Sequence, residues 1–158
     1  MVVLLMFLLS GGLGELDFDT RLIHKLSQIL NVTPPTKILV ERLDQKELLG
    51  DLRGTILKNC MGGRPDLFQY CAEVARQYTE TAFVHGIWIE EKDPTFLHIK
   101  LYKRSGIDAL IHEYLHWYLN YKTRPHGVIN THEVLLPLVT TLLASNELQV
   151  WLEKEEKP

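Results

Sequence analysis

Residues 107–119 read Ile-Asp-Ala-Leu-Ile-His-Glu-Tyr-Leu-His-Trp-Tyr-Leu, and both the fold and the chemistry are predicted from this stretch. Its apolar residues recur three and four positions apart, which is typical of one face of an amphipathic helix. We therefore predict a helix over residues 106–121. His112 and His116 are four residues apart, so both imidazoles lie on one face of that helix, close enough to bind one metal ion.

The pattern His112-Glu113-x-x-His116 predicts a catalytic zinc site. Zinc binds imidazole nitrogen well, and a catalytic zinc needs a third protein ligand and an open position for water. Glu113 can reach that water, act as general base and pass the proton to the leaving amine. We therefore expect zinc as cofactor, a peptide or protein as substrate, and peptide-bond hydrolysis as reaction. A helix with two ordinary histidines is the alternative.

The third zinc ligand has three candidates further along the chain: His126, His132 and Glu133. Glu133 would belong to a second helix, predicted over residues 131–152, which could carry a carboxylate to the metal. With Asn130 as N-cap, the same Glu133 could instead close a capping box. The oxyanion of the tetrahedral intermediate needs a hydrogen-bond donor, and several side chains could supply it: His126, His132, Tyr118, Tyr121 and Arg124.

From Thr95 to Leu143 the chain resembles the gluzincin metallopeptidases, including their minimal single-domain members. In that family a Glu on a later helix follows H-E-x-x-H as the third ligand. The resemblance implies a zincin-like domain with His112, His116 and Glu133 as ligands and Glu113 as general base. The pair His126-Gly127 is similar instead to the SprT-like proteases, which act on DNA-bound proteins, and implies His126 as a ligand.

The segments before the metal-binding pattern predict a small mixed sheet. Residues 82–90 and 95–102 are rich in β-branched and aromatic residues and are joined by Glu91-Lys92-Asp93-Pro94, so we predict a hairpin. A further strand is predicted over residues 37–43. Helices are predicted over residues 17–30 and 65–78, whereas residues 44–60 stay undecided because Gly50 and Gly54 disfavour a helix. This order predicts an α+β fold, in which helices back a small mixed sheet.

A peptidase must hold an extended peptide beside its metal, and adding the peptide to a free sheet edge achieves this. We expect residues 82–90 to supply that edge and to form the rim of the cleft. Gly86 allows close approach of another backbone, and the residues after it, Ile87, Trp88 and Ile89, favour a strand. The alternative is that both hairpin strands are internal.

The composition bounds the class of protein. The chain has 158 residues, 46% of them apolar, which predicts one domain over residues 1–158 with a solvated tail at 153–158. A formal net charge of −3 gives no strong nucleic-acid signal. The apolar run in residues 1–14 is shorter than the ~20 residues of a transmembrane helix, so none is predicted. We expect this run to be a buried strand or to fill a groove in a cytoplasmic protein; the alternative is the signal peptide of a secreted one.

The chain has two cysteines. Two thiols, Cys60 and Cys71, are not a disulfide framework, so we predict that both are free and do not form a single bridge.

A zinc-stabilised binding or regulatory module without turnover is the alternative to an enzyme. A Glu113→Gln change separates the two, because a module would keep its activity after this change.

Overall fold

The computed structural model describes residues 16–123 and 132–156, apart from the side chains of residues 121–123 and 132–133. Within these ranges three strands form one sheet in the order β1 (Lys37–Leu43), β3 (Phe96–Tyr102), β2 (Gly86–Ile89). β1 and β3 are parallel, and β2 and β3 are antiparallel. The α+β class, the mixed sheet and the hairpin are therefore confirmed. β2 lies at one edge of the described sheet, as expected of a cleft rim.

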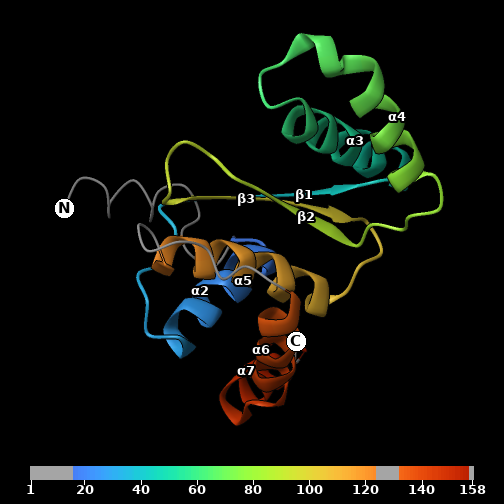
Figure 1. The fold of residues 1–158 in the computed structure, drawn as a ribbon. Helices are drawn as coiled ribbons and strands as arrows, with labels where there is room; N and C mark the ends of the chain where they lie inside the picture. Colours follow the sequence, from blue (N-terminus) through green and yellow to red (C-terminus); the bar gives the residue numbers. More distant parts are fainter. Residues whose placement is uncertain (1–15, 124–131, 157–158) are drawn as a thin grey trace.

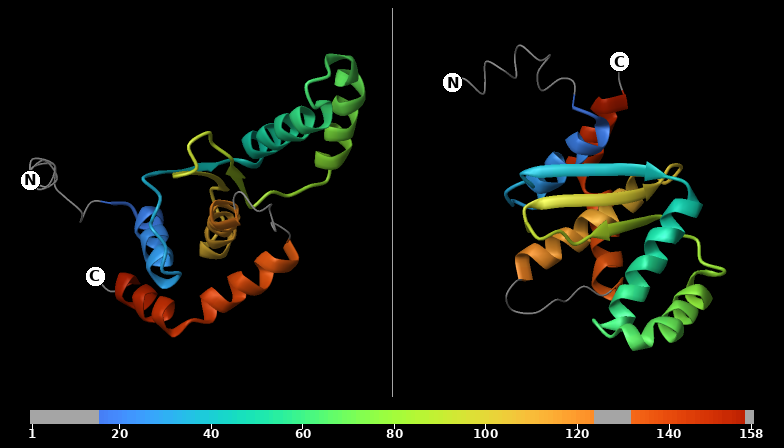
Figure 2. Two further views of the ribbon diagram at one scale, coloured as in Figure 1. Left: turned by 60° about the vertical axis from the view of Figure 1, so that its left-hand side comes forward. Right: turned by 90° about the horizontal axis from the view of Figure 1, so that it is seen from above.

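Helices lie on both sides of this sheet (Figures 1 and 2). One side carries α2 (Phe18–Ile29) and α5 (Ile107–Thr123), with α6 (His132–Ala144) and α7 (Asn146–Glu156) beyond them. The other side carries a helical hairpin that projects past the sheet; it consists of α3 (Gln45–Met61), a 3-10 turn (Pro65–Leu67) and α4 (Phe68–Thr79).

The core lies between the sheet and the first group of helices. Along β3 every second residue is fully buried, namely Leu97, Ile99 and Leu101, which is the period of a strand with one face on the core. These residues pack in one cluster with the apolar stripes of α2 and α5. The hydroxyls of Ser27 on α2 and Tyr114 on α5 are 2.9 Å apart and hydrogen-bonded, so the buried phenol has a polar partner. Burial raises the pKa of Tyr114 to about 12, and the hydrogen bond to Ser27 opposes this shift.

Residues 44–60, left undecided by the sequence, form α3 despite Gly50 and Gly54. A Cβ at either glycine would meet no atom within 4 Å, so both positions face open space. The helix ends at Gly62, whose φ of 56° is left-handed and whose N–H donates to the carbonyl of Lys58. The Gly62-Gly63 turn then reverses the chain into α4.

The prediction of two free cysteines is wrong. Cys60 on α3 and Cys71 on α4 form a disulfide, with their Cα atoms 5.6 Å apart. The sequence alone does not show that the intervening turn brings the two helices side by side, which places both thiols within bonding distance.

The prediction of one helix over residues 131–152 is also wrong, because α6 and α7 meet at a bend of 59°. Ser145 separates them, and its hydroxyl accepts a hydrogen bond from the N–H of Leu148 at 3.2 Å, as an N-cap does. No single helix in residues 16–123 or 132–156 is long and apolar enough to cross a membrane, although the bent pair α6–α7 passes that test by length and composition together.

The first hairpin strand is shorter than predicted, since β2 begins only at Gly86. The preceding Val84 forms hydrogen bonds with a side chain instead of a strand. Its N–H donates to Gln45 Oε1 at 3.0 Å, and its carbonyl accepts from Gln45 Nε2 at 2.6 Å. Gln45 thereby ties the start of α3 to the segment that enters β2.

Candidate metal centre

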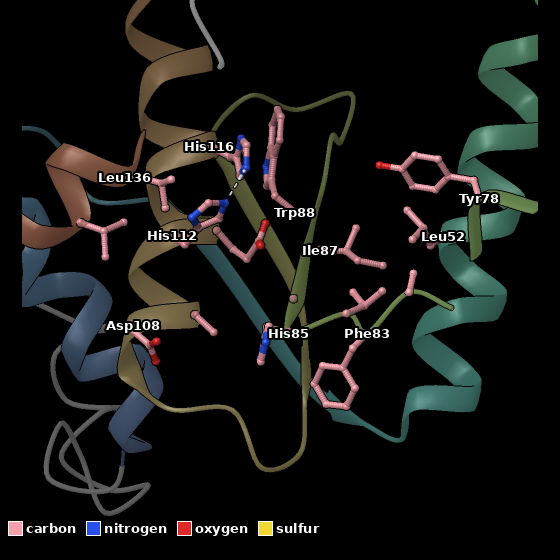
Figure 3. Close-up of a pocket in the computed structure, with 16 residues that line it drawn as sticks. Leu52, Tyr78, Phe83, His85, Ile87, Trp88, Asp108, His112, His116 and Leu136 are labelled. Atoms are coloured by element: carbon pink, nitrogen blue, oxygen red, sulfur yellow. Dashed lines mark hydrogen bonds between the residues drawn. The ribbon is translucent and has the colours of Figure 1, made fainter. Parts of the chain in front are cut away.

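His112, Glu113 and His116 come together on α5 as predicted, with one ligand atom of each within 4.8 Å of the others. The Nε2 atoms of His112 and His116 are 3.2 Å apart (Figure 3). Two nitrogens bound to one tetrahedral zinc at about 2.0–2.1 Å would be ~3.3 Å apart. The two imidazoles therefore already have the spacing that a shared metal ion requires. In the described ranges this is the one group of three such side chains close enough to hold a metal.

The helix α5 holds these side chains in place because its opposite face is buried. Leu110, Ile111, Tyr114 and Leu115 have no exposed surface and fix the helix against the sheet and α2. Directly after the motif, Trp117 is buried, and its indole Nε1 donates to the carbonyl of Pro94 at 2.8 Å. The two histidines are half-buried, on the face that borders a cavity.

Glu113 is packed against the backbone of the edge strand. A Cβ on Gly86 would lie 2.8 Å from Glu113 Cγ and 2.8 Å from Leu101 Cδ2, so only glycine leaves room for the carboxylate here. The side chain of Glu113 is held from the same strand, because the backbone N–H of Trp88 donates to it. Glu113 is 7% exposed, and this burial raises its pKa to about 7, against the effect of the Trp88 hydrogen bond.

Trp88 also contacts the metal group through its ring. Its indole stacks on the His116 imidazole, with centroids 6.3 Å apart and planes only 6° from parallel. This contact restricts the rotation of the imidazole. Trp88 borders the cavity, whereas Trp117 is buried.

The cavity beside the metal group has a volume of about 590 Å³ and lies between α5 and the α3–α4 hairpin, across the edge of β2 (Figure 3). Its size is within the range of small-ligand sites. The residues around it come from six parts of the chain and include Leu52, Tyr78, Phe83, His85, Gly86, Ile87, Trp88, Asp108, His112, Glu113, His116 and Leu136.

Comparison with known proteins gives no match. No protein family, no curated protein and no solved structure is significantly similar to the chain. The residues of the site themselves form an H-E-x-x-H group whose ligand atoms are close enough to hold a metal ion.

The other predicted site residues are placed less completely. Glu133 and His132 are the first residues of α6, but their side chains lie outside the described residues, as do those of His126, Tyr121 and Arg124. Tyr118 is described and packs on the core side of α5, stacked on Tyr114 with centroids 6.5 Å apart. It is not among the residues that border the cavity, so the cavity lends no support to its role as an oxyanion donor.

Sequence reasoning missed three groups around the cavity. Asp108 borders it one helical turn before His112, and its four-residue spacing was a signal that could have been used. His85 also borders it. The hairpin residues Leu52 and Tyr78 gave no local signal, because only the tertiary fold brings α3 and α4 opposite α5.

The edge strand turns its peptide groups outward at every second residue. In the antiparallel pair, Tyr102 N–H donates to the His85 carbonyl at 2.9 Å, so residue 85 faces β3 with its hydrogen-bonding groups. Hydrogen-bonded positions alternate along such a pair, which turns the peptide groups of Ile87 toward β3 and those of Gly86 and Trp88 outward. A proline at position 87 would therefore remove a hydrogen bond between β2 and β3, and not a hydrogen bond that the rim offers to a substrate.

Proposed function

We propose that this chain is a zinc-dependent peptidase. Its zinc ligands are His112, His116 and Glu133, and its general base is Glu113. The observation that carries the proposal is the 3.2 Å approach of the two Nε2 atoms, beside a buried carboxylate and a cavity bordered by an edge strand. A bound zinc ion would polarise the scissile carbonyl and lower the pKa of a water molecule.

The residues of the chain then have separate tasks. Glu113 accepts the proton of the attacking water and returns it to the leaving amine, and its neighbours Gly86 and Trp88 hold it in the required orientation. The outward peptide groups of β2 can pair with an extended substrate. Because Trp88 N–H donates to Glu113 in this structure, the groups of Gly86 and the carbonyl of Trp88 are left to a substrate backbone.

The assignment of Glu133 is supported by its position on α6. Leu136 and Val139 on this helix border the cavity, and Figure 3 shows Leu136 next to His112. Residues three apart on a helix share a face, and Glu133 precedes Leu136 by three positions. His132 precedes Leu136 by four positions and Val139 by seven, so on an ideal helix it shares their face more directly than Glu133 does. We favour the carboxylate because two histidines and one glutamate are a ligand set of catalytic zinc sites.

The test is zinc content and cleavage of an unstructured protein by purified variants. We expect about one zinc per chain in the wild type and in Glu113→Gln, with cleavage at least 100-fold slower in Glu113→Gln. Glu153→Gln, on the exposed tail of α7, is the matched control and should cleave normally. His116→Ala should lose the zinc, whereas His24→Ala, on the exposed side of α2, should keep it.

Two outcomes would overturn the proposal. Wild type without zinc after chelator-free purification would remove the metal site. Zinc-loaded wild type that cleaves nothing, or Glu113→Gln that retains full activity, would leave a zinc-stabilised binding module instead.

The disulfide bears on where the protein works. Disulfides persist mainly in oxidising compartments and are rare in reducing cytosol. The Cys60–Cys71 bridge therefore favours the secreted alternative over the cytoplasmic one. Counting free thiols in protein taken directly from its native source decides this, because two free thiols would restore the cytoplasmic prediction.

A further inference from the structure

The cavity has an apolar wall opposite the metal group, made by Leu52, Tyr78, Phe83 and Ile87. In Figure 3 these four side chains lie across the edge of β2 from His112 and His116. They come from α3, α4, the segment before β2, and β2 itself. None of the described residues around this cavity is a lysine or arginine, and its carboxylates, Asp108 and Glu113, are on the α5 side.

The apolar wall is unusual in its exposure. Tyr78 is 69% exposed and Phe83 is 56% exposed. Seven large hydrophobic side chains are exposed in the described parts of the chain, and three of them, Tyr78, Phe83 and Leu136, surround this one cavity. Folding alone gives no reason for such clustering, whereas an exposed apolar patch around a cleft is typical of a binding site.

The backbone that carries the wall is held by several contacts. The Phe83 ring contacts Tyr102 edge-on, with centroids 5.1 Å apart, and the double hydrogen bond between Gln45 and Val84 fixes the next residue. Arg53 Nε donates to Thr79 Oγ1 at 2.7 Å and so joins α3 to the end of α4. The disulfide closes the far end of the same hairpin. A preformed wall loses little entropy when it binds, so its apolar surface adds directly to affinity.

We propose that the apolar wall selects substrates, which are extended peptides with bulky aromatic or aliphatic side chains at every second position. This inference rests on the proposed peptidase function. Side chains of an extended peptide alternate between its two faces. A peptide added to β2 therefore turns one set of side chains toward α5 and the other toward the apolar wall. Acidic side chains find no cation there.

The test uses the zinc-loaded Glu113→Gln protein and fluorescein-labelled peptides, so that binding is measured without cleavage. One peptide carries Phe at alternate positions between Ser residues. A second has the same composition with its Phe residues in adjacent pairs. A third replaces each alternate Phe by Asp. We expect the first peptide to bind about tenfold more tightly than the second. The difference in affinity between the first and the third should be larger still.

Two variants locate the selecting surface. Tyr78→Ala in the same background should lose most of the preference for the first peptide. Tyr70→Ala is the matched control, because Tyr70 is on the same helix and is 68% exposed, but does not border the cavity. It should bind all three peptides as the parent does.

The outcomes separate this inference from the proposed function. Equal binding of the three peptides, no binding of any, or an unchanged preference in Tyr78→Ala overturns the selection by the apolar wall. If the preference is found but the zinc-loaded wild type leaves the first peptide uncleaved, selection by the apolar wall is supported and the peptidase function is contradicted.

Discussion

At the scale of single residues, the contact between Gly86 and Glu113 is the tightest constraint on the site. Any other residue at position 86 would place its Cβ 2.8 Å from Glu113 Cγ, on one side, and 2.8 Å from Leu101 on the other. Both contacts are too close for real atoms, so the Glu113 and Leu101 side chains would both have to shift. Gly86 thus sets the position of the proposed general base.

Gly86→Ala is expected to slow cleavage by about 10–100-fold, since a displacement of about 1 Å in a reacting group costs that much. Zinc content should stay at the wild-type level, because His112 and His116 are not contacted by the new methyl group. Gly50→Ala, at a position open to solvent, is the control and should cleave normally. A Gly86→Ala protein with wild-type rates would show that the orientation of Glu113 does not depend on this contact.

The burial of Glu113 predicts a pH-dependent stability of the metal-free protein. Its pKa is raised from 4.5 to about 7, so the folded state holds the proton more tightly than the unfolded chain. Below pH 4.5 the buried carboxyl is neutral and does not lower the stability of the folded state. The free energy of unfolding falls as the pH rises from there to about 7. Glu113→Gln, which cannot ionise, should therefore become progressively more stable than wild type over this interval, by up to about 3 kcal/mol.

Urea unfolding at a series of pH values in the presence of a chelator measures this difference. Glu153→Gln serves again as the control and should follow wild type throughout. A difference between Glu113→Gln and wild type that stays constant from pH 4 to pH 8 would contradict the raised pKa.

At the scale of elements, the sequence predicted those parts whose apolar residues repeat with a clear period. The helix α5 and the strand β3 were foreseen to within two residues, because buried residues recur every three to four positions in one and every two in the other. The hairpin α3–α4 could not be foreseen as a unit. Only Leu48 in α3 is fully buried, so its sequence lacks a strong apolar stripe and its helix depends on tertiary contacts.

The glycines of α3 offer a direct test of that explanation. Gly54→Ala should stabilise the protein by about 0.5–1 kcal/mol, because the helix interior has space for a methyl group and alanine has the higher helix propensity. Gly62→Ala, at the left-handed position that ends the same helix, should destabilise it by about 1–2 kcal/mol. Thermal or urea unfolding of both variants gives the two signs, and equal signs would contradict the assigned ends of α3.

At the scale of the whole molecule, the site combines a local motif with parts that are distant in sequence. His112, Glu113 and His116 lie within one helix, so their grouping was predictable from spacing alone. The apolar wall and the third ligand depend on how α3, α4 and α6 pack around α5, and no residue pattern specifies that packing. This is why three candidates for the third ligand remained after the sequence had been analysed.

Zinc titration of three variants decides among those candidates. Glu133→Ala should weaken zinc binding by at least tenfold, while His126→Ala and His132→Ala should bind zinc nearly as the wild type does. If Glu133 acts only as a helix cap, its removal should cost about 0.5–2 kcal/mol of stability and leave the zinc affinity intact. Loss of zinc in His126→Ala would favour the SprT-like ligand arrangement.

The parallel pairing of β1 with β3 has a consequence for how the chain reaches its native state. The residues that join these strands include Thr36 and Thr95, which are hydrogen-bonded although they are 59 positions apart. A ladder between such distant segments forms late, because a long loop must first be closed. The hairpin α3–α4 lies within that loop and can form from local contacts alone. During synthesis β1 would therefore leave the ribosome well before β3. The helices α3 and α4 would fold while β1 is still unpaired.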